Sequence, residues 1–299
     1  MEKICVSVPA TSANVGAGFD AVGLALGLYN TVAFFPSEKL EIFTADGTEV
    51  PEDESNLVYE AVKYLCEKAE APVPTLRIVQ TNPIPMARGL GSSSACIIAG
   101  LLGANRMLGE PFGRAELLEF ATEMEGHPDN VAPALLGGFV SSVRAGGKVY
   151  AVKHDLDDSL AFAAIIPDYP LLTSAARAAL PKTVPHADAV FNLSRTALLG
   201  EAFCNGRHDL LPIVTQDTLH QDYRMKLMPG SDEVFANAKR LGARAVYVSG
   251  AGSTMMAVVE QADAYSFCTG MKAALAQSPV CKNFALRRLS VDNRGARVE

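Results

Sequence analysis

The stretch RGLGSSSACIIAG, residues 88–100, places two glycines and three serines directly before an apolar run. Glycine lets the backbone approach a ligand closely, and the N–H groups in the first turn of a helix have no partner within that helix. The helix dipole adds about half a positive charge at the same end. The stretch therefore predicts a helix from about Ser92 to Leu108 whose first turn binds an anion. A plain Gly/Ser turn that caps a core helix has the same composition and is the structural alternative.

This loop differs from two common nucleotide-binding loops. No G-x-x-x-x-G-K-[ST] occurs anywhere in the chain, which excludes a Walker A loop. The first expected strand, residues 4–8, is followed by PATSANVGAGFD and not by the glycine fingerprint of a dinucleotide-binding enzyme. A dinucleotide-dependent oxidoreductase is therefore disfavoured.

Composition narrows the class of protein further. The net charge of −7 argues against a nucleic-acid binder, because phosphate backbones require a basic surface, although a local pocket can still be positive. No apolar run approaches the roughly 20 residues of a membrane span, and MEKICVSVPATSA lacks the apolar core of a signal peptide. The six cysteines are scattered without a C-x-x-C, which is typical of reduced thiols. We expect a cytoplasmic protein that acts on a small molecule, without nucleic-acid or membrane partners.

Strand and helix patterns occur in both halves of the 299 residues. Strands are expected at 4–8, 23–35, 40–45, 75–81, 138–144, 148–154, 159–167 and 284–291, with two more around a glycine turn within 243–260. Helices are expected at 57–69 with Ser55 as N-cap, at 92–108, at 114–124, from HPDN at 127–130, between 172 and 241, and at 261–277. Mixed elements in both halves predict two α+β domains, residues 1–155 and 156–299, joined by the acidic segment HDLDDS.

Three motifs, in order along the chain, resemble those of the GHMP kinase superfamily. PATSANVGAGFDAVGLAL (9–26), IPMARGLGSSSA (84–95) and VSGAGSTMMAV (248–258) are similar to its first, second and third motifs. The run N-x-G-x-G-F-D and EGHPDNVAPALLGG (125–138) are most similar to the homoserine kinase branch. The resemblance implies a left-handed β-α-β unit in the N-terminal domain, an exception to the usual handedness, and a ferredoxin-like C-terminal domain.

The resemblance also implies an activity, namely transfer of a phosphoryl group from ATP, with Mg²⁺, to the hydroxyl of L-homoserine. Another hydroxyl acceptor and a non-catalytic ligand-binding module of the same fold are the alternatives. A homodimer is expected from the family alone.

Nucleotide and metal ligands follow from the same similarity. The loop residues expected to bind ATP are Pro85, Met86, Ala87, Arg88, Gly89, Leu90, Gly91, Ser92, Ser93, Ser94 and Ala95. Asn56, at a helix start, and Thr173, one helical turn before Arg177, are expected beside them. Mg²⁺ is expected at Ser93 and Glu123, because hard cations prefer oxygen ligands; Glu125, two positions further on, is the rival carboxylate.

Residues expected to contact the acceptor are Asn14, Asp20, His127, Arg177, Arg224, Gly250 and Gly252. Homoserine is a zwitterion, so its site needs both signs of charge. Arg177 and Arg224 can hold a carboxylate in the fork geometry of guanidinium groups, and Asp20 can face the ammonium. These three residues are also expected to act in catalysis. Asp20 and Asp129 are candidates for accepting the hydroxyl proton, but the resemblance implies no clear general base, and none is assigned.

Overall fold

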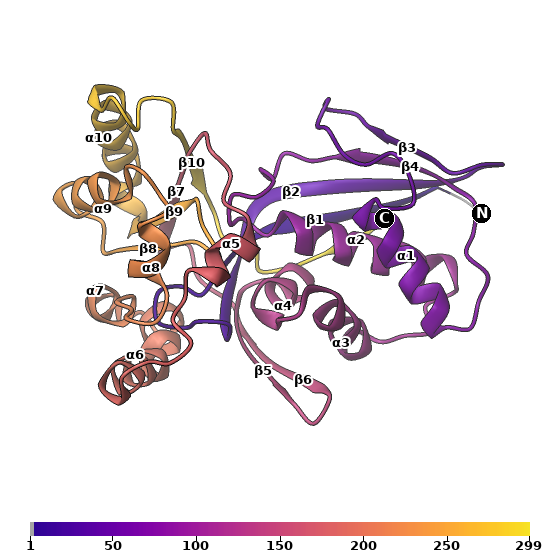
Figure 1. Ribbon diagram of the computed structural model, residues 1–299, viewed down its shortest axis with the longest axis horizontal. Helices are drawn as coiled ribbons and strands as arrows, with labels where there is room; N and C mark the ends of the chain where they lie inside the picture. The colour runs from indigo at the N-terminus through magenta and orange to yellow at the C-terminus, as the bar shows by residue number, and fades with distance from the viewer. Residues whose placement is uncertain (1–2) are drawn as a thin grey trace.

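The computed structural model describes residues 3–299, and within them two β-sheets lie at opposite ends of the long axis (Figure 1). The first sheet contains β1 (Ile4–Ala13), β2 (Val22–Pro36), β3 (Glu41–Thr44), β4 (Leu76–Thr81), β5 (Phe139–Ala145), β6 (Lys148–His154) and β11 (Arg297–Val298). The second contains β7 (Leu160–Ile166), β8 (Ala245–Val248), β9 (Met255–Glu260) and β10 (Ala285–Leu289).

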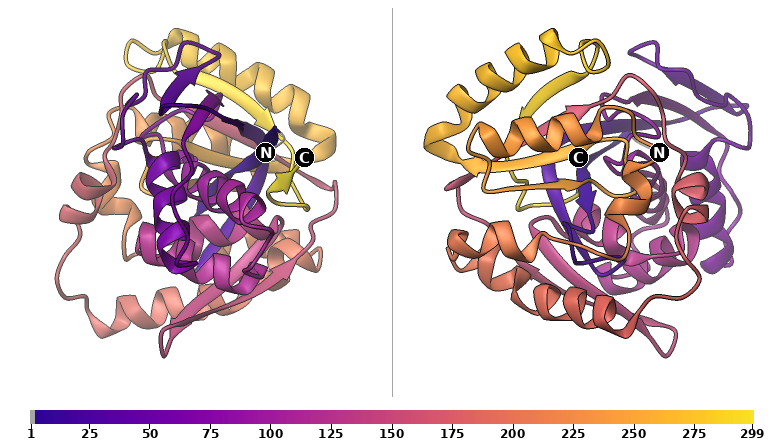
Figure 2. Two further views of the ribbon diagram at one scale, coloured as in Figure 1. Left: turned by 90° about the vertical axis from the view of Figure 1, so that its right-hand side faces the viewer. Right: turned by 60° about the vertical axis from the view of Figure 1, so that its left-hand side comes forward.

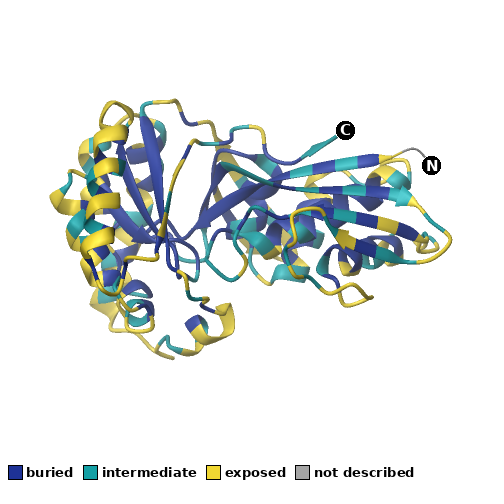
Figure 3. Ribbon diagram, turned by 90° about the horizontal axis from the view of Figure 1, so that it is seen from above, coloured by how far each residue is buried: buried dark blue, intermediate teal, exposed yellow. Residues whose placement is uncertain are grey.

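Helices pack on both sheets. They are α1 (Leu57–Lys68), α2 (Ser92–Met107), α3 (Arg114–Glu125), α4 (Pro128–Leu136), α5 (Thr173–Ala178), α6 (His186–Cys204), α7 (Leu211–Val214), α8 (Gln221–Met225), α9 (Ser231–Arg240) and α10 (Ala264–Gln277), with short 3₁₀ turns η1 (His208–Leu210) and η2 (Gln261–Asp263). Figure 3 shows the strands of both sheets as largely buried, whereas the outward faces of α9 and α10 are exposed.

The first sheet is built around the antiparallel pair of β1 and β2. β1 continues to Ala13, beyond the strand expected at residues 4–8. Its register with β2 shifts between Pro9 and Ala10, after which it pairs as far as Gly23. Because a β-bulge tolerates proline, the strand continues through a residue that usually ends one. β3 and β4 run parallel and are joined through α1, so they form a β-α-β unit where the resemblance implies one.

The second sheet has the strand order β10-β7-β9-β8, and all its neighbouring strands are antiparallel. Numbered along the chain, that order is four, one, three, two, which is the order of a ferredoxin-like βαββαβ unit. Helices α9 and α10 contact each other and pack on its outer face (Figures 1 and 2). The expected ferredoxin-like architecture of the second half is confirmed.

The acidic segment at residues 154–159 joins the two sheets, because β6 ends at His154 and β7 begins at Leu160. After β10 the chain returns to the first sheet. There β11 pairs with β1, and the N–H of Gly27 donates to the carbonyl of Ser290 at 2.8 Å. The last residues therefore lie with the N-terminal sheet. The expected division, with a second domain at residues 156–299, instead groups them with the second sheet.

Helix α1 begins at Leu57, as expected, but with a different N-cap from the one predicted. Ser55 was expected as the N-cap, but its hydroxyl donates to Asp53. Asn56 is the N-cap instead, and its Oδ1 accepts the N–H of Val58 at 3.0 Å. Both residue types cap helices well, so composition alone does not separate them.

Helix α2 packs closely against β2 and α1, because small residues face both neighbours. A Cβ at Gly103 would lie 2.4 Å from the ring of Phe34, and one at Gly100 would lie 2.3 Å from the carbonyl oxygen of Val58. Neither distance leaves room for a side chain. The glycines therefore fix the depth of α2 in the core and, with it, the position of the helix start at Gly91.

Replacing Gly103 with alanine is expected to lower the free energy of unfolding by about 1–3 kcal/mol, because an extra methyl group overfills a packed core. Urea denaturation measures the change. Gly200→Ala is the matched control: Gly200 lies within α6 with no atom near the position of an added Cβ, so there the better helix propensity of alanine stabilises by up to about 1 kcal/mol. Equal effects of the two substitutions would contradict this packing.

Two class-level observations agree with the composition. None of the helices within residues 3–299 is long and apolar enough to cross a membrane. All six cysteines lie in the described part of the chain and are unpaired there. The expectation of free thiols is confirmed.

Candidate functional site

A cavity of about 330 Å³ is lined by residues from both halves of the chain. It lies between the start of α2, the loop that follows β1, and the β8–β9 turn. The residues expected at the site that line it are Asn14, Asp20, Asn56, Met86, Ala87, Arg88, Gly89, Gly91, Ser92, Ser93, His127, Thr173, Arg177, Arg224, Gly250 and Gly252. Five expected residues are not among the lining residues: Pro85, Leu90, Ser94, Ala95 and Glu123.

The glycines of the loop before α2 have no room for side chains. Gly91 is the N-cap of α2 with φ of 71°, and a Cβ there would lie 1.9 Å from the Thr11 hydroxyl oxygen. Gly89 has φ of 72°, and its Cβ would lie 2.2 Å from the carbonyl oxygen of Ser249. Both positions therefore require glycine, and the backbone itself forms the floor of the cavity. The first N–H groups of α2, from Ser92 onward, have no carbonyl partner within the helix.

Arg88 lines the cavity, but its N–H groups are hydrogen-bonded to the second half of the chain. Its Nε and Nη2 donate to the carbonyl oxygens of Pro167 and Asp168 at 3.0 and 2.9 Å. Burial lowers the pKa of its guanidinium. Arg88 therefore ties the loop to the second sheet rather than offering its charge to the cavity.

The two candidate metal carboxylates face different neighbours. Glu125 accepts a hydrogen bond from the Ser93 hydroxyl at 2.9 Å and lines the cavity. Glu123 instead accepts hydrogen bonds from the Tyr64 hydroxyl and from Lys68, which together lower its pKa. Residues two apart on a helix point to different faces. The structure thus brings Glu125, and not the expected Glu123, to Ser93.

Asn56 lines one end of the cavity with its side chain already engaged. Its Oδ1 accepts from Val58 N–H and from Gln80 Nε2, the latter at 3.0 Å, and its Nδ2 donates to Pro51. The remaining Nδ2 hydrogen is the group that it can offer a ligand. Gln80, on β4, also lines the cavity and was not anticipated, because its alternating strand pattern shows only that it faces inward.

The other end of the cavity contains paired opposite charges. Arg177 donates two parallel hydrogen bonds to the carboxylate of Asp20, at 2.8 and 3.1 Å. This pairing raises the pKa of Arg177. The N–H of Asp20 in turn donates to Asn14, whose Nδ2 donates to the carbonyl of Gly250. The expected anionic and cationic groups therefore meet in this structure, 157 positions apart in sequence.

Arg224 is almost fully buried behind this pair. It is 2% exposed, and its Nη1 donates to the carbonyl of Gly250 at 2.8 Å. Burial and the nearby charge of Arg177 lower its pKa to about 10, so it stays charged at neutral pH. Within residues 3–299 its Nε has no hydrogen-bond partner. An unpaired buried donor is costly.

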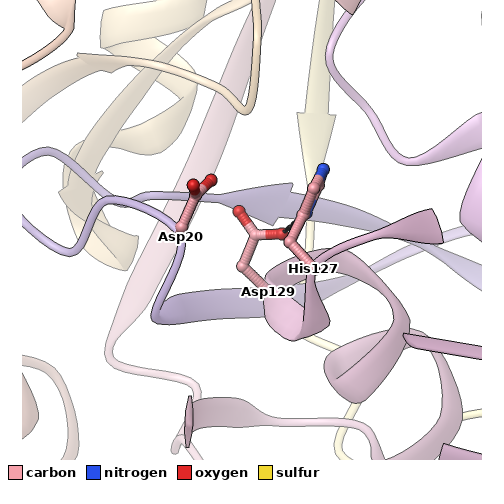
Figure 4. Close-up of side chains that lie close together, drawn as sticks. All are labelled: Asp20, His127 and Asp129. Carbon is pink, nitrogen blue, oxygen red and sulfur yellow. Dashed lines mark hydrogen bonds and ion pairs between the residues drawn. The ribbon is translucent and has the colours of Figure 1, made fainter. Parts of the chain in front are cut away.

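His127 and Asp129 extend the polar surface of the cavity (Figure 4). The His127 ring is hydrogen-bonded to the carboxylate of Asp129. Burial acts to lower the pKa of His127, but the bond and charge of Asp129 outweigh it, so that pKa is raised. Asp20, His127 and Asp129 bring their donor atoms within 4.8 Å of one another. The cluster is thus anionic beside two guanidinium groups, and it suits a ligand that carries both signs.

Other lining residues were also missed at the sequence level, and Asn130 and Cys96 are two of them. Asn130 accepts the hydroxyl hydrogen of Thr11 at 2.7 Å, and Cys96 lies on α2 one turn beyond Ser93. Asn130 belongs to the HPDN segment, in which the histidine and the aspartate were considered as functional residues and the asparagine was not. Helical spacing from Ser93 was the available signal for Cys96.

Family comparisons agree with this geometry. The description "GHMP kinases N terminal domain" matches residues 56–138, and "GHMP kinases C terminal" matches residues 195–277. Homoserine kinase of Clostridium beijerinckii is 44% identical over 99% of this chain and 98% of its own length. The chain belongs to the homoserine kinase family. Homoserine kinase of Caldicellulosiruptor saccharolyticus is 42% identical over 99% of this chain and 96% of its own length.

A solved structure extends the same relationship. The crystal structure of homoserine kinase from Cytophaga hutchinsonii superposes with a TM-score of 0.88 at 30% identity, covering 100% of this chain and 98% of that one. The resemblance read from three short motifs is thereby confirmed, and so is the expectation of a small-molecule kinase.

Proposed function

We propose that this protein transfers the terminal phosphoryl group of ATP to the side-chain hydroxyl of L-homoserine, giving ADP and O-phospho-L-homoserine. The observation that carries the proposal is a single cavity with an anion-binding helix start at one end and paired opposite charges at the other. Membership of the homoserine kinase family supports the same acceptor. No feature of the site favours an uncharged sugar or a non-catalytic role.

The residues at the helix start fit a nucleotide with its metal ion. Free N–H groups and the dipole of α2 favour phosphate oxygens, and the glycine backbone allows them to approach. The Ser93 hydroxyl and Glu125 carboxylate are hard oxygen donors, which Mg²⁺ prefers. A bound Mg²⁺ would be held there by Ser93 and Glu125 and would supply positive charge against the phosphate oxygens. We therefore assign Glu125, in place of Glu123, as the metal carboxylate.

The charged end fits the backbone of an amino acid. Arg224 and Arg177 can take the α-carboxylate, and Asp20 the α-ammonium, so a zwitterion satisfies the groups that otherwise pair with each other. The ligand is held at both charges, and its hydroxyl extends toward the start of α2. In this scheme the protein acts mainly by positioning and charge neutralisation.

Substitution of Gly91 by alanine is expected to weaken MgATP binding at least about tenfold, which is about 1.4 kcal/mol. The added Cβ would overlap the Thr11 hydroxyl, and alanine rarely adopts the positive φ of this position, so the loop must move. Titration calorimetry measures the affinity. Gly109→Ala is the matched control, since Gly109 has φ of 81° with open space around it. Unchanged binding in Gly91→Ala would remove the nucleotide assignment from this loop.

An ADP-release assay with L-homoserine, mevalonate, galactose and shikimate tests the acceptor. We expect turnover with homoserine to exceed that with the other three at equal concentration. Faster turnover of any of the others would replace the proposed acceptor.

A further inference from the structure

Arg224 is held from behind by a buried histidine that the cavity does not expose. The His220 side chain is fully buried, and its Nδ1 lies 3.2 Å from Nη1 of Arg224. Among the described residues His220 does not line the cavity, whereas Arg224 does. Its influence on a ligand must therefore pass through the arginine.

The contacts of His220 fix its protonation state. Its Nε2 lies 2.8 Å from the carbonyl oxygen of Gly16, which can only accept. Arg224 can only donate, so Nδ1 must accept. His220 is therefore neutral, with its hydrogen on Nε2 and its lone pair directed at the guanidinium. The loop before it is fixed as well, since Asp217 accepts the N–H groups of His220 and Gln221 at 2.8 and 2.7 Å.

Phe19 connects this histidine to both arginines. Its ring stacks on His220 with centroids 5.1 Å apart and an interplanar angle of 21°. The guanidinium carbons of Arg224 and Arg177 lie 5.2 and 5.9 Å from the centre of the same ring. The stacked pair of Phe19 and His220 therefore lies against both guanidinium groups.

We propose that His220 is a positioning residue for acceptor binding: as a neutral hydrogen-bond acceptor it holds the Arg224 guanidinium in the orientation that receives the acceptor's carboxylate. The proposal rests on the proposed function and deepens it, because it names what determines affinity at the charged end. Loss of the acceptor atom should raise KM for homoserine and leave kcat and MgATP affinity nearly unchanged.

A pH dependence follows from the same geometry. Protonation of His220 would remove the acceptor and place a cation against Arg224. The groups that face it are Asp217, Arg224 and, from the loop after β1, Asp20. Burial lowers the pKa of His220 and the charge of Arg224 adds to that effect, against the carboxylate of Asp217. Folded His220 therefore stays neutral down to below pH 6.5, and KM should rise as the pH falls through this acidic range.

Two substitutions separate the acceptor from the packing. Asparagine places an amide oxygen near the position of Nδ1, facing Arg224, whereas glutamine reaches the position of Nε2, facing Gly16. His220→Gln is expected to raise KM for homoserine about tenfold, with kcat within about threefold, because a hydrogen bond to a charged group is lost. His220→Asn is expected to stay within about threefold of the wild-type KM and to lose the acidic rise in KM. His208→Gln, at a histidine that pairs with Glu260, is the matched control.

The outcomes are separable. Equal KM increases in His220→Asn and His220→Gln, no increase in either, or a fall in kcat without a change in KM would overturn the positioning role. If His220→Gln does not fold, as judged by MgATP titration, the wild-type and His220→Asn pH profiles decide, and an acidic rise in KM that persists in His220→Asn overturns the proposal. Absence of homoserine-dependent ADP release by the wild-type protein would overturn the proposed function instead.

Discussion

Replacing Arg224 with alanine is expected to lower kcat/KM for L-homoserine at least about thirtyfold, while the affinity for MgATP stays within about twofold. Arg224 is buried, bonded to Gly250 through Nη1, and unpaired at Nε among the described residues. Removing one partner of a buried charge pair costs about 2–5 kcal/mol, and about 1.4 kcal/mol is a factor of ten. Steady-state kinetics and calorimetry measure the two quantities.

Arg224→Lys refines this prediction, because lysine keeps the charge but not the planar fork. It should recover only part of the lost kcat/KM. Arg240→Ala, on the exposed face of α9, is the control and should leave both quantities unchanged. Wild-type kcat/KM in Arg224→Ala, or an equal loss of MgATP affinity, would contradict the assignment of Arg224 to the acceptor.

Glu125→Ala is expected to lower kcat about a hundredfold or more, the scale at which a single preorganised electrostatic group contributes to transfer chemistry. Glu125 is the carboxylate bonded to the Ser93 hydroxyl beside the start of α2. The concentration of Mg²⁺ needed for half-maximal rate should also rise, since one oxygen ligand is removed.

Glu123→Ala is the matched control, because it changes a carboxylate two positions away that pairs with Lys68 at the surface. We expect its kcat and its Mg²⁺ requirement to remain within about twofold of wild type. The reverse pattern, with a large loss in Glu123→Ala and a small one in Glu125→Ala, would restore the assignment expected from sequence similarity.

The fold was predictable where local patterns are strong. Gly89, Gly91 and the apolar run after Ser94 predict the helix start, and α2 begins at Ser92 as expected. The extension of β1 through Pro9 was not predictable, because proline usually indicates the end of a strand and the sequence does not show the bulge at that position. The pairing of β11 with β1 joins the two ends of the chain, and no local pattern contains it.

The sequence predicted which residues line the cavity better than it predicted which partners those residues contact. Motif similarity correctly selected most residues that line the cavity, but it did not resolve Glu123 from Glu125, since both lie in one acidic helix end. Arg88 looks like an anion ligand in sequence, yet carbonyl oxygens of a distant segment take its donors. The support of Arg224 by His220 depends on Gly16, over 200 positions away, and becomes visible only in three dimensions.

The central claim is that this cavity joins a phosphoryl group to the hydroxyl of an amino acid. Phosphorus NMR of the wild-type protein with ATP, Mg²⁺ and L-homoserine tests it most directly. We predict one phosphate monoester signal, coupled to the side-chain methylene protons of homoserine, that grows in equal amount with ADP. ADP formed with inorganic phosphate alone, or no ADP at all, would contradict the account.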